Sequence, residues 1–309
     1  MSRDSIEAVL IGAATGDALG WPVEFMSLGE IKAKYGPPGI QELPDPALVT
    51  DDTQMTIALA EGLLDARVDA DIDSQMNAVG RRFVEWLHRQ TDPAYSRAPG
   101  VASMKGSAQF EHGVPWRECG GPDSKGCGAA MRVASIGYLY QDNPSRLKEV
   151  AASSATITHR HPTAIAAAVG AAFAVKFALD GVPIDGLIHE VDEATRGISD
   201  EFSDTLLRIG HVGGLADEEA AIRHIGAGWV GDQAVALALY CVVRYPNDFV
   251  GCVRRGANLT GDSDSVASIA GGISAAYLGL DAIPAAWQDR IEGREGLIDL
   301  SARLATARS

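Results

Sequence analysis

The sequence predicts an all-α fold, and three observations lead to that class. Aromatic residues make up only 6% of the 309 residues and alanine is abundant, which favours closely packed helices. Apolar residues recur at helical spacing in several segments. Short alternating runs typical of β-strands are hard to find, so the pattern gives no strand–helix–strand rhythm.

Six segments carry the helical pattern. In chain order they are the stripe Ile6, Val9, Leu10 and Ala13, then Thr53–Leu64, a short stretch around Leu147–Ala152, 162–179, Trp229–Tyr240 and Val266–Tyr277. We expect Asp51 or Asp52 to cap the second helix, because acids are favoured at the positive end of a helix dipole. Pro162 suits the first turn of a helix that runs to about Leu179.

Glycine and proline mark two long loops, 36–49 and 91–126. Loops of this length inside a compact domain are usually functional. The chain shows neither a linker between two composition regimes nor a repeat of fixed period. We therefore expect one domain over residues 1–309.

The composition limits the class of partner. Lys and Arg number 26 against 41 Asp and Glu, a net charge of −15, which disfavours nucleic acid and anionic membranes because both need a basic face. The apolar runs Ala164–Val175 and Ser265–Leu280 are shorter than a membrane span of roughly 18–20 residues. The four cysteines form no CxxC pair and the first residues do not resemble a signal peptide. We expect a soluble cytoplasmic protein with reduced thiols and, since no long apolar heptad occurs, a monomer.

Two acidic motifs stand at helix entrances. TDDT, Thr50 to Thr53, and GDSDS, Gly261 to Ser265, each combine two carboxylates with hydroxyls, the oxygen ligands that Mg²⁺, Mn²⁺ or Ca²⁺ prefer. Either motif by itself also fits an ordinary helix cap. If they meet, four carboxylates would need about two divalent ions to stay ionised.

Three further motifs are weaker signals. Glu24, in GDALGWPVEF, lies among apolar residues that can raise the pKa of a carboxyl, although taken alone the pattern fits an exposed loop position better. GCGAAMRVA, Gly126 to Ala134, can present backbone N–H groups to a phosphate or form an ordinary tight turn. In THRHP, His159 and His161 lack further ligands at zinc-site spacing, so a helix-entrance role with a bond to a ligand or a carbonyl fits better than a metal.

Taken in order, these motifs resemble those of the ADP-ribosylglycohydrolase family, which includes the dinitrogenase-reductase-activating glycohydrolase. The resemblance runs from GAATGDALGWPVEF through VTDDTQM, GCGAAMR, THRHP and GWVGDQAVALALY to GDSDSVASIAGGISAAYLG. It implies a compact orthogonal helical bundle that holds two Mg²⁺ or Mn²⁺ ions in a central cleft.

The resemblance also implies roles for individual residues. Metal ligands would be Thr50, Asp51 and Asp52 from one side and Asp262, Asp264 and Ser265 from the other. Glu24 would lie beside the distal ribose, with Glu24, Asp52 and Asp262 as the catalytic set. The diphosphate would lie on Gly126, Cys127, Gly128 and Ala129, with His159 or His161 along the ADP-ribose groove and Trp229 near the adenine. Relatives often have Thr at the positions of Ser263 and Ser265, where Ser keeps the hydroxyl, and Asn at the position of Cys127, where the amide is lost.

The expected activity is metal-dependent hydrolysis of an N- or O-glycosidic ADP-ribosyl bond. Such a cleavage builds positive charge on the sugar, and metal ions can orient its hydroxyls and activate water. Glu24 or Asp52 would then move the proton. Two alternatives stay open: a Mg²⁺ phosphohydrolase acting on a nucleotide diphosphate, and a non-enzymatic ADP-ribose-binding or crystallin-like protein. The sequence leaves open whether the scissile bond joins ADP-ribose to arginine, serine, a nucleic-acid base or a metabolite.

Overall fold

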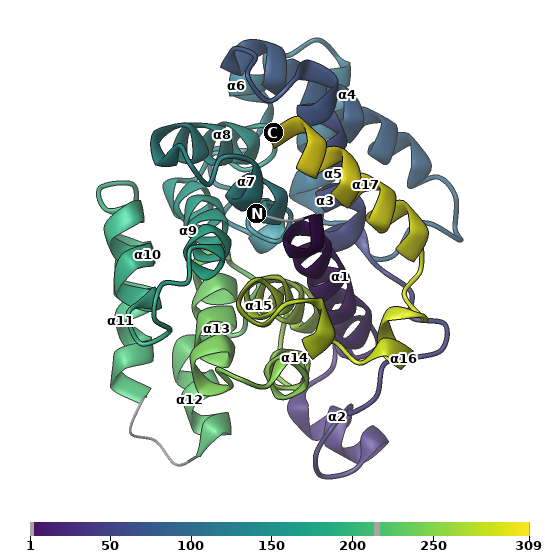
Figure 1. The fold of residues 1–309 in the computed structure, drawn as a ribbon, viewed down its shortest axis with the longest axis vertical. Coiled ribbons are helices and arrows are strands. Elements are labelled where there is room, and N and C mark those ends of the chain that lie inside the picture. The colour runs from purple at the N-terminus through teal and green to yellow at the C-terminus, as the bar shows by residue number, and fades with distance from the viewer. Residues whose placement is uncertain (1–2, 213–216, 309) are drawn as a thin grey trace.

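The computed structural model describes residues 3–212 and 217–308, and within these ranges the chain is helical with no β-strand (Figure 1). The 17 α-helices are α1 Arg3–Gly20, α2 Leu28–Tyr35, α3 Asp51–Ala66, α4 Ile72–Arg89, α5 Val101–Glu111, α6 Trp116–Cys119, α7 Ala134–Leu139, α8 Pro144–Thr156, α9 Pro162–Leu179, α10 Leu187–Thr195, α11 Asp200–Val212, α12 Glu218–Ile225, α13 Gly231–Arg244, α14 Phe249–Ala257, α15 Ser263–Leu278, α16 Ala285–Gln288 and α17 Arg294–Arg308. Three short 3-10 helices, η1 Trp21–Val23, η2 Cys127–Ala129 and η3 Leu280–Ala282, complete the set. The predicted all-α class is confirmed.

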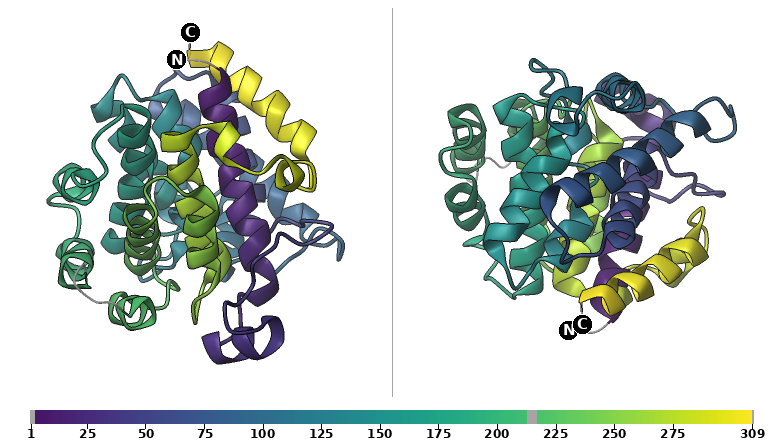
Figure 2. Two further views of the ribbon diagram at one scale, coloured as in Figure 1. Left: turned by 60° about the horizontal axis from the view of Figure 1, so that its bottom comes forward. Right: turned by 90° about the horizontal axis from the view of Figure 1, so that it is seen from above.

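Helices α1 and α15 form the centre of the bundle, and all three views place them side by side (Figures 1 and 2). Glycines allow this pair to approach backbone to backbone. A Cβ built on Gly16 would lie 1.9 Å from the carbonyl oxygen of Ala267, and one on Gly20 would lie 2.4 Å from the Cα of Asp264. Because the end of α1 meets the start of α15, the helices run antiparallel. This contact brings the segment after α1 next to the acidic start of α15.

Helix α9 lies in the core beside α8, α10 and α13. Among the described residues it is the one helix that is apolar and long enough to cross a membrane, yet 78% of its 18-residue window is buried inside the protein. The apolar run Ala164–Val175, by itself too short for a span, is part of this longer helix. Its bounds, Pro162–Leu179, are those predicted.

The prediction of a continuous loop over 91–126 is wrong, because this segment contains α5 and α6. Helix α5 shows no apolar residues at helical spacing, because its buried face is made of the small residues Ser103, Gly106 and Ser107. A Cβ on Gly106 would lie 2.4 Å from the carbonyl oxygen of Ile157, so this helix packs by close backbone approach. The other predicted loop, 36–49, contains no helix.

The cap of α3 also differs from the prediction. Thr50 is the N-cap residue, and its side chain accepts a hydrogen bond from the backbone N–H of Asp52 at 3.3 Å. Asp51 and Asp52 lie in the first turn of the helix, where the positive end of its dipole favours carboxylates. Their side chains are therefore free of the capping role and available to the cavity described below.

Candidate active site

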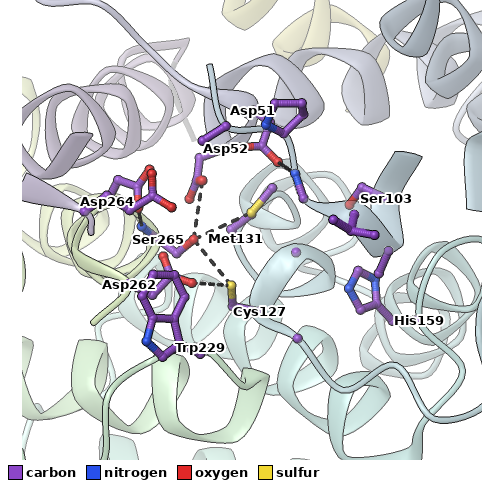
Figure 3. A pocket seen from close by; sticks show the side chains of 18 of the residues that line it. Asp51, Asp52, Ser103, Cys127, Met131, His159, Trp229, Asp262, Asp264 and Ser265 are labelled. Carbon is purple, nitrogen blue, oxygen red and sulfur yellow. Dashed lines mark hydrogen bonds between the residues drawn. The ribbon is translucent and has the colours of Figure 1, made fainter. Parts of the chain in front are cut away.

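A cavity of about 530 Å³ opens where the segment that follows α1 lies beside the starts of α3, α5 and α15 (Figure 3). Its lining is Glu24, Phe25, Asp51, Asp52, Ala98, Pro99, Gly100, Val101, Ala102, Ser103, Gly126, Cys127, Gly128, Met131, His159, Trp229, Asp262, Asp264 and Ser265. All five motifs of the sequence analysis contribute at least one residue to this lining.

The two acidic motifs meet in the cavity although they lie more than two hundred residues apart in the chain. The hydroxyl of Thr50 lies 3.4 Å from Oδ2 of Asp264, and the hydroxyl of Ser265 lies 3.4 Å from Oδ2 of Asp52. The starts of α3 and α15 therefore face each other, each with its hydroxyl near the other's carboxylate. Thr50 is fully buried and does not line the open cavity.

Burial and mutual repulsion make this group of carboxyls hard to ionise. Loss of solvent is the first cause that raises the pKa of Glu24 to about 9 and that of Asp51 to about 7, and neighbouring carboxylates raise both further. For the same reasons the pKa values of Asp52 and Asp264 lie well above their usual range, and burial also raises that of Asp262. Without a compensating positive charge, the five groups do not all ionise together.

The oxygens of this cluster fit a cation. One ligand oxygen each from Glu24, Asp262 and Asp264 lies within 4.8 Å of the others, a spacing that a single metal ion can bridge. Glu24 Oε2 and Asp52 Oδ1 are buried and have no hydrogen-bond partner among the described residues. Unpartnered buried carboxylate oxygens are costly, and a hard divalent cation would satisfy them.

Asp17 supports the site and is not among the site residues predicted from the sequence. It is fully buried in α1 and accepts hydrogen bonds from the backbone N–H groups of Thr50 and Thr53 at 3.0 and 3.1 Å. It also accepts from the hydroxyls of both threonines, at 2.9 and 2.5 Å. Burial raises its pKa to about 6. In the sequence, the available signal was the position of Asp17 in a run of small residues, directly after Gly16, which contacts α15.

The glycine-rich loop lies as predicted at the cavity, with one exception. Gly126, Cys127 and Gly128 line it, whereas Ala129 is buried beneath. The Cys127 thiol donates a hydrogen bond to Oδ2 of Asp262 at 2.7 Å. The sulfur of Cys127 therefore contacts the acidic cluster directly.

The two histidines of THRHP separate. His159 lines the cavity and is almost fully buried. His161 does not line it. Instead it is the N-cap of α9, where Nδ1 accepts a hydrogen bond from the N–H of Thr163 at 3.2 Å. His161 therefore contributes to the start of α9 and not to the lining of the cavity.

The mouth of the cavity is aromatic. Trp229 is 44% exposed and Phe25 is 68% exposed, and their rings stack with centroids 5.7 Å apart and planes 15° apart. Phe25 was missed, since a single exposed aromatic residue has no periodicity to reveal it. The segment from Ala98 to Ser103 was missed as well, because α5 itself was not predicted.

Comparisons with known proteins agree with this arrangement. The family model for ADP-ribosylglycohydrolase matches residues 1–309. ADP-ribosylhydrolase ARH3 of Mus musculus is 27% identical over 330 residues, covering 93% of this chain and 87% of the relative. ADP-ribosyl-[dinitrogen reductase] glycohydrolase of Rhodospirillum rubrum is 27% identical over 304 residues, covering 94% and 91%.

A solved structure extends the likeness to three dimensions. The chain described as an ADP-ribosylglycohydrolase-related protein complex superposes with a TM-score of 0.77 at 27% identity, covering 99% of both chains. The family model, the relatives and the fold point to the same enzyme class. The chain belongs to the ADP-ribosylglycohydrolase family.

Proposed function

We propose that this protein hydrolyses the glycosidic bond between the distal ribose of ADP-ribose and a modified target, and that Mg²⁺ is required. The observation that carries the proposal is the buried group of carboxyls at the base of an open cavity, with two oxygens that have no partner. Membership in the family supplies the reaction class. The named relatives act on ADP-ribosyl groups, which supports ADP-ribose as the common part of the substrate.

We propose that the metal ligands come from the two acidic motifs at the facing starts of α3 and α15. The ligand residues are Thr50, Asp51, Asp52, Asp262, Asp264 and Ser265. We propose two ions, because one divalent charge leaves several of the buried carboxylates uncompensated. Mn²⁺ has the same preference for oxygen ligands and is the alternative metal. When bound, such ions would orient the vicinal ribose hydroxyls and acidify a water molecule.

The protein's own groups would handle the proton. Glu24 and Asp52 each have a buried oxygen without a partner, so both have a free acceptor site in the cavity. Cleavage of the ribosyl bond requires one carboxyl to assist the attacking water or the leaving group. Glu24→Gln and Asp52→Asn separate the two candidates: the residue that moves the proton is the one whose variant loses kcat but keeps metal affinity.

The rest of the cavity would bind the ADP part of the substrate. We propose that Gly126, Cys127 and Gly128 contact the diphosphate with their backbone, and that His159 lies along the same groove. Trp229, stacked on Phe25 at the mouth, offers a planar surface for the adenine. These assignments leave Ala129 and His161 in supporting roles.

Product analysis with a panel of substrates tests the proposal. The panel contains proteins ADP-ribosylated on arginine and on serine, an ADP-ribosylated nucleic-acid base and O-acetyl-ADP-ribose, each incubated with Mg²⁺. We expect free ADP-ribose from at least one of them. Release of AMP or phosphate instead would identify a phosphohydrolase, and no release from any member would favour a non-enzymatic protein.

We also propose that residues 1–309 act as one domain and as a monomer in the cytoplasm. All four cysteines are unpaired, as expected for a reducing compartment. Light scattering of the purified protein at micromolar concentration checks the monomer, since a dimer would double the measured mass.

A further inference from the structure

The acidic motif at the start of α3 is entered from residues 36–49, a segment that contains no helix. Its path toward Thr50 is therefore set by contacts with other parts of the chain. The first of these is with the segment that leads into α17. The N–H of Glu292 donates to the carbonyl oxygen of Ala47 at 3.0 Å, and the N–H of Ala47 donates to the carbonyl oxygen of Arg290 at 3.3 Å. This contact brings the side chain of Glu292 close to the residue that precedes Thr50.

Arg97 and Glu292 bind both backbone groups of Val49, which is buried. The N–H of Val49 donates to Oε2 of Glu292 at 3.1 Å, and Nη1 of Arg97 donates to the carbonyl oxygen of Val49. The two side chains also form a two-pronged ion pair, with Nη1 2.6 Å from Oε2 and Nη2 2.9 Å from Oε1. The side chain of Arg97 is only 10% exposed and that of Glu292 is 39% exposed. A planar guanidinium in this arrangement fixes the direction of its partners, which a lysine ammonium would not do.

The segment that begins at Arg97 also reaches the carboxylate of Asp51. The N–H of Gly100 donates to Oδ2 of Asp51 at 3.0 Å, so residues 97–100 contact the chain just before and just after Thr50. Between these two contacts Ala98 has a φ of 45°, in the left-handed region that a residue with a Cβ rarely adopts. Strained backbone of this kind persists where the surrounding contacts hold it in place. Arg97 thus holds one end of a strained segment whose other end orients a carboxylate of the cavity.

We infer that Arg97 and Glu292 are positioning residues that hold Thr50 and Asp51 where a divalent cation can bind them. The inference rests on the proposed function, in which Thr50 and Asp51 are metal ligands. Neither Arg97 nor Glu292 belongs to the described lining of the cavity, so both act through the backbone of Val49 and not on the cation itself. Residues that support metal ligands from outside in this way typically contribute about 10–100-fold to metal affinity.

Magnesium titrations of matched variants test the positioning role. Calorimetry measures the Mg²⁺ affinity of wild type, Arg97→Ala, Glu292→Ala and Glu292→Gln. We expect both alanine variants to bind Mg²⁺ about tenfold more weakly or worse. Glu292→Gln should recover most of the affinity that Glu292→Ala loses, because its amide oxygen can still accept from Val49 and from Arg97. An affinity equal to that of wild type in either alanine variant would overturn the inference.

The direction of the changes separates positioning from a simple effect of charge. Removing the positive charge of Arg97 would by itself strengthen Mg²⁺ binding, and removing the negative charge of Glu292 would weaken it. Loss of the contacts with Val49 weakens Mg²⁺ binding in both cases. Opposite changes in the two alanine variants, or a Glu292→Gln variant that binds as weakly as Glu292→Ala, would show that charge alone is responsible and would refute the positioning role.

A second ion pair provides the control for stability. Arg303 of α17 contacts Glu61 of α3 in the same two-pronged way, at 2.6 and 2.7 Å. We expect Arg303→Ala to keep the Mg²⁺ affinity of wild type, and urea unfolding in chelator gives the stability of every variant. An equal loss of Mg²⁺ affinity in Arg303→Ala and Arg97→Ala would identify general destabilisation as the cause and overturn the inference. Should Arg97→Ala fail to fold, the two variants of the more exposed Glu292 decide the question by themselves.

Turnover of the same samples keeps the inference apart from the proposed function. Hydrolysis by wild type together with unchanged Mg²⁺ affinities in the variants would refute the positioning role and leave the activity standing. Mg²⁺ affinities that depend on Arg97 and Glu292, without hydrolysis of any ADP-ribosylated substrate, would support the positioning role and refute the activity. Absence of Mg²⁺ binding in wild type would overturn both.

Discussion

The buried, neutral state of His159 makes a quantitative prediction about stability and pH. The ring has a pKa of about 3 in the folded protein, against an ordinary value of 6.5. Between these values the unfolded chain binds a proton that the folded chain excludes. Stability from this group is therefore complete above pH 6.5 and is lost as the pH falls toward 3.

The size of the effect follows from the two pKa values. Between pH 7.5 and pH 5.0 the preferential protonation of the unfolded chain at this one site costs about 2 kcal/mol. The buried carboxyls of the acidic cluster have raised pKa values and change stability in the opposite direction over the same range. A comparison with a variant that lacks the imidazole removes their contribution.

His159→Asn is the variant of choice, because its side-chain amide can form a hydrogen bond with the Thr158 hydroxyl, which lies 2.7 Å from Nδ1 of His159. Urea unfolding of both proteins at pH 7.5 and 5.0, in chelator, gives four free energies of unfolding. We expect the difference between wild type and variant to shift by about 2 kcal/mol against wild type on going to pH 5.0. A difference that is the same at both pH values would show that the pKa of His159 is near normal and refute the reasoning.

Three further predictions concern packing, metal and substrate. Gly16→Ala should destabilise the protein by about 1–3 kcal/mol or more in thermal or urea unfolding, because the added carbon would lie 1.9 Å from a backbone oxygen of α15. Gly29→Ala is the control and should show no such loss, because its added carbon would have its nearest neighbour 3.9 Å away. Asp262→Asn should lose Mg²⁺ affinity, measured by calorimetry, together with turnover, measured as ADP-ribose release. Normal turnover with metal bound would contradict the assignment of Asp262. Asp281 is exposed, so Asp281→Asn is the control and should behave as wild type. Trp229→Ala should raise KM for the ADP-ribosylated substrate about tenfold with little change in kcat, because a stacking surface is worth roughly 1–3 kcal/mol; an unchanged KM would exclude stacking.

The fold was predictable where burial follows a helical period. Helix α9 begins and ends at the predicted residues because Pro162 and an unbroken apolar run define it. Helix α5 was not predictable, since its buried face consists of serine and glycine, which carry no apolar signal. The close approach of α1 to α15 was visible only as an excess of small residues, without an indication of which helices would pair.

The candidate site was predictable where chemistry stands out in the sequence. The paired carboxylates of TDDT and GDSDS were recognisable in the sequence, and the fold brings them within hydrogen-bond distance of each other's hydroxyls. Phe25 and Ser103 became visible only in the structure, because their significance depends on what lies across the cavity. His159 and His161 looked equivalent in the sequence, and only the geometry separates a cavity residue from a helix cap.

The most direct test of the central claim is the release of free ADP-ribose from a protein ADP-ribosylated on arginine, with Mg²⁺ and with chelator, beside Asp51→Asn. The account predicts release that requires Mg²⁺ and is lost in the variant. Should arginine be the wrong linkage, the serine, base and O-acetyl substrates must give the same pattern. Release that is equal in chelator, or undiminished in Asp51→Asn, would contradict the claim that the buried carboxylates and their metal carry out the reaction.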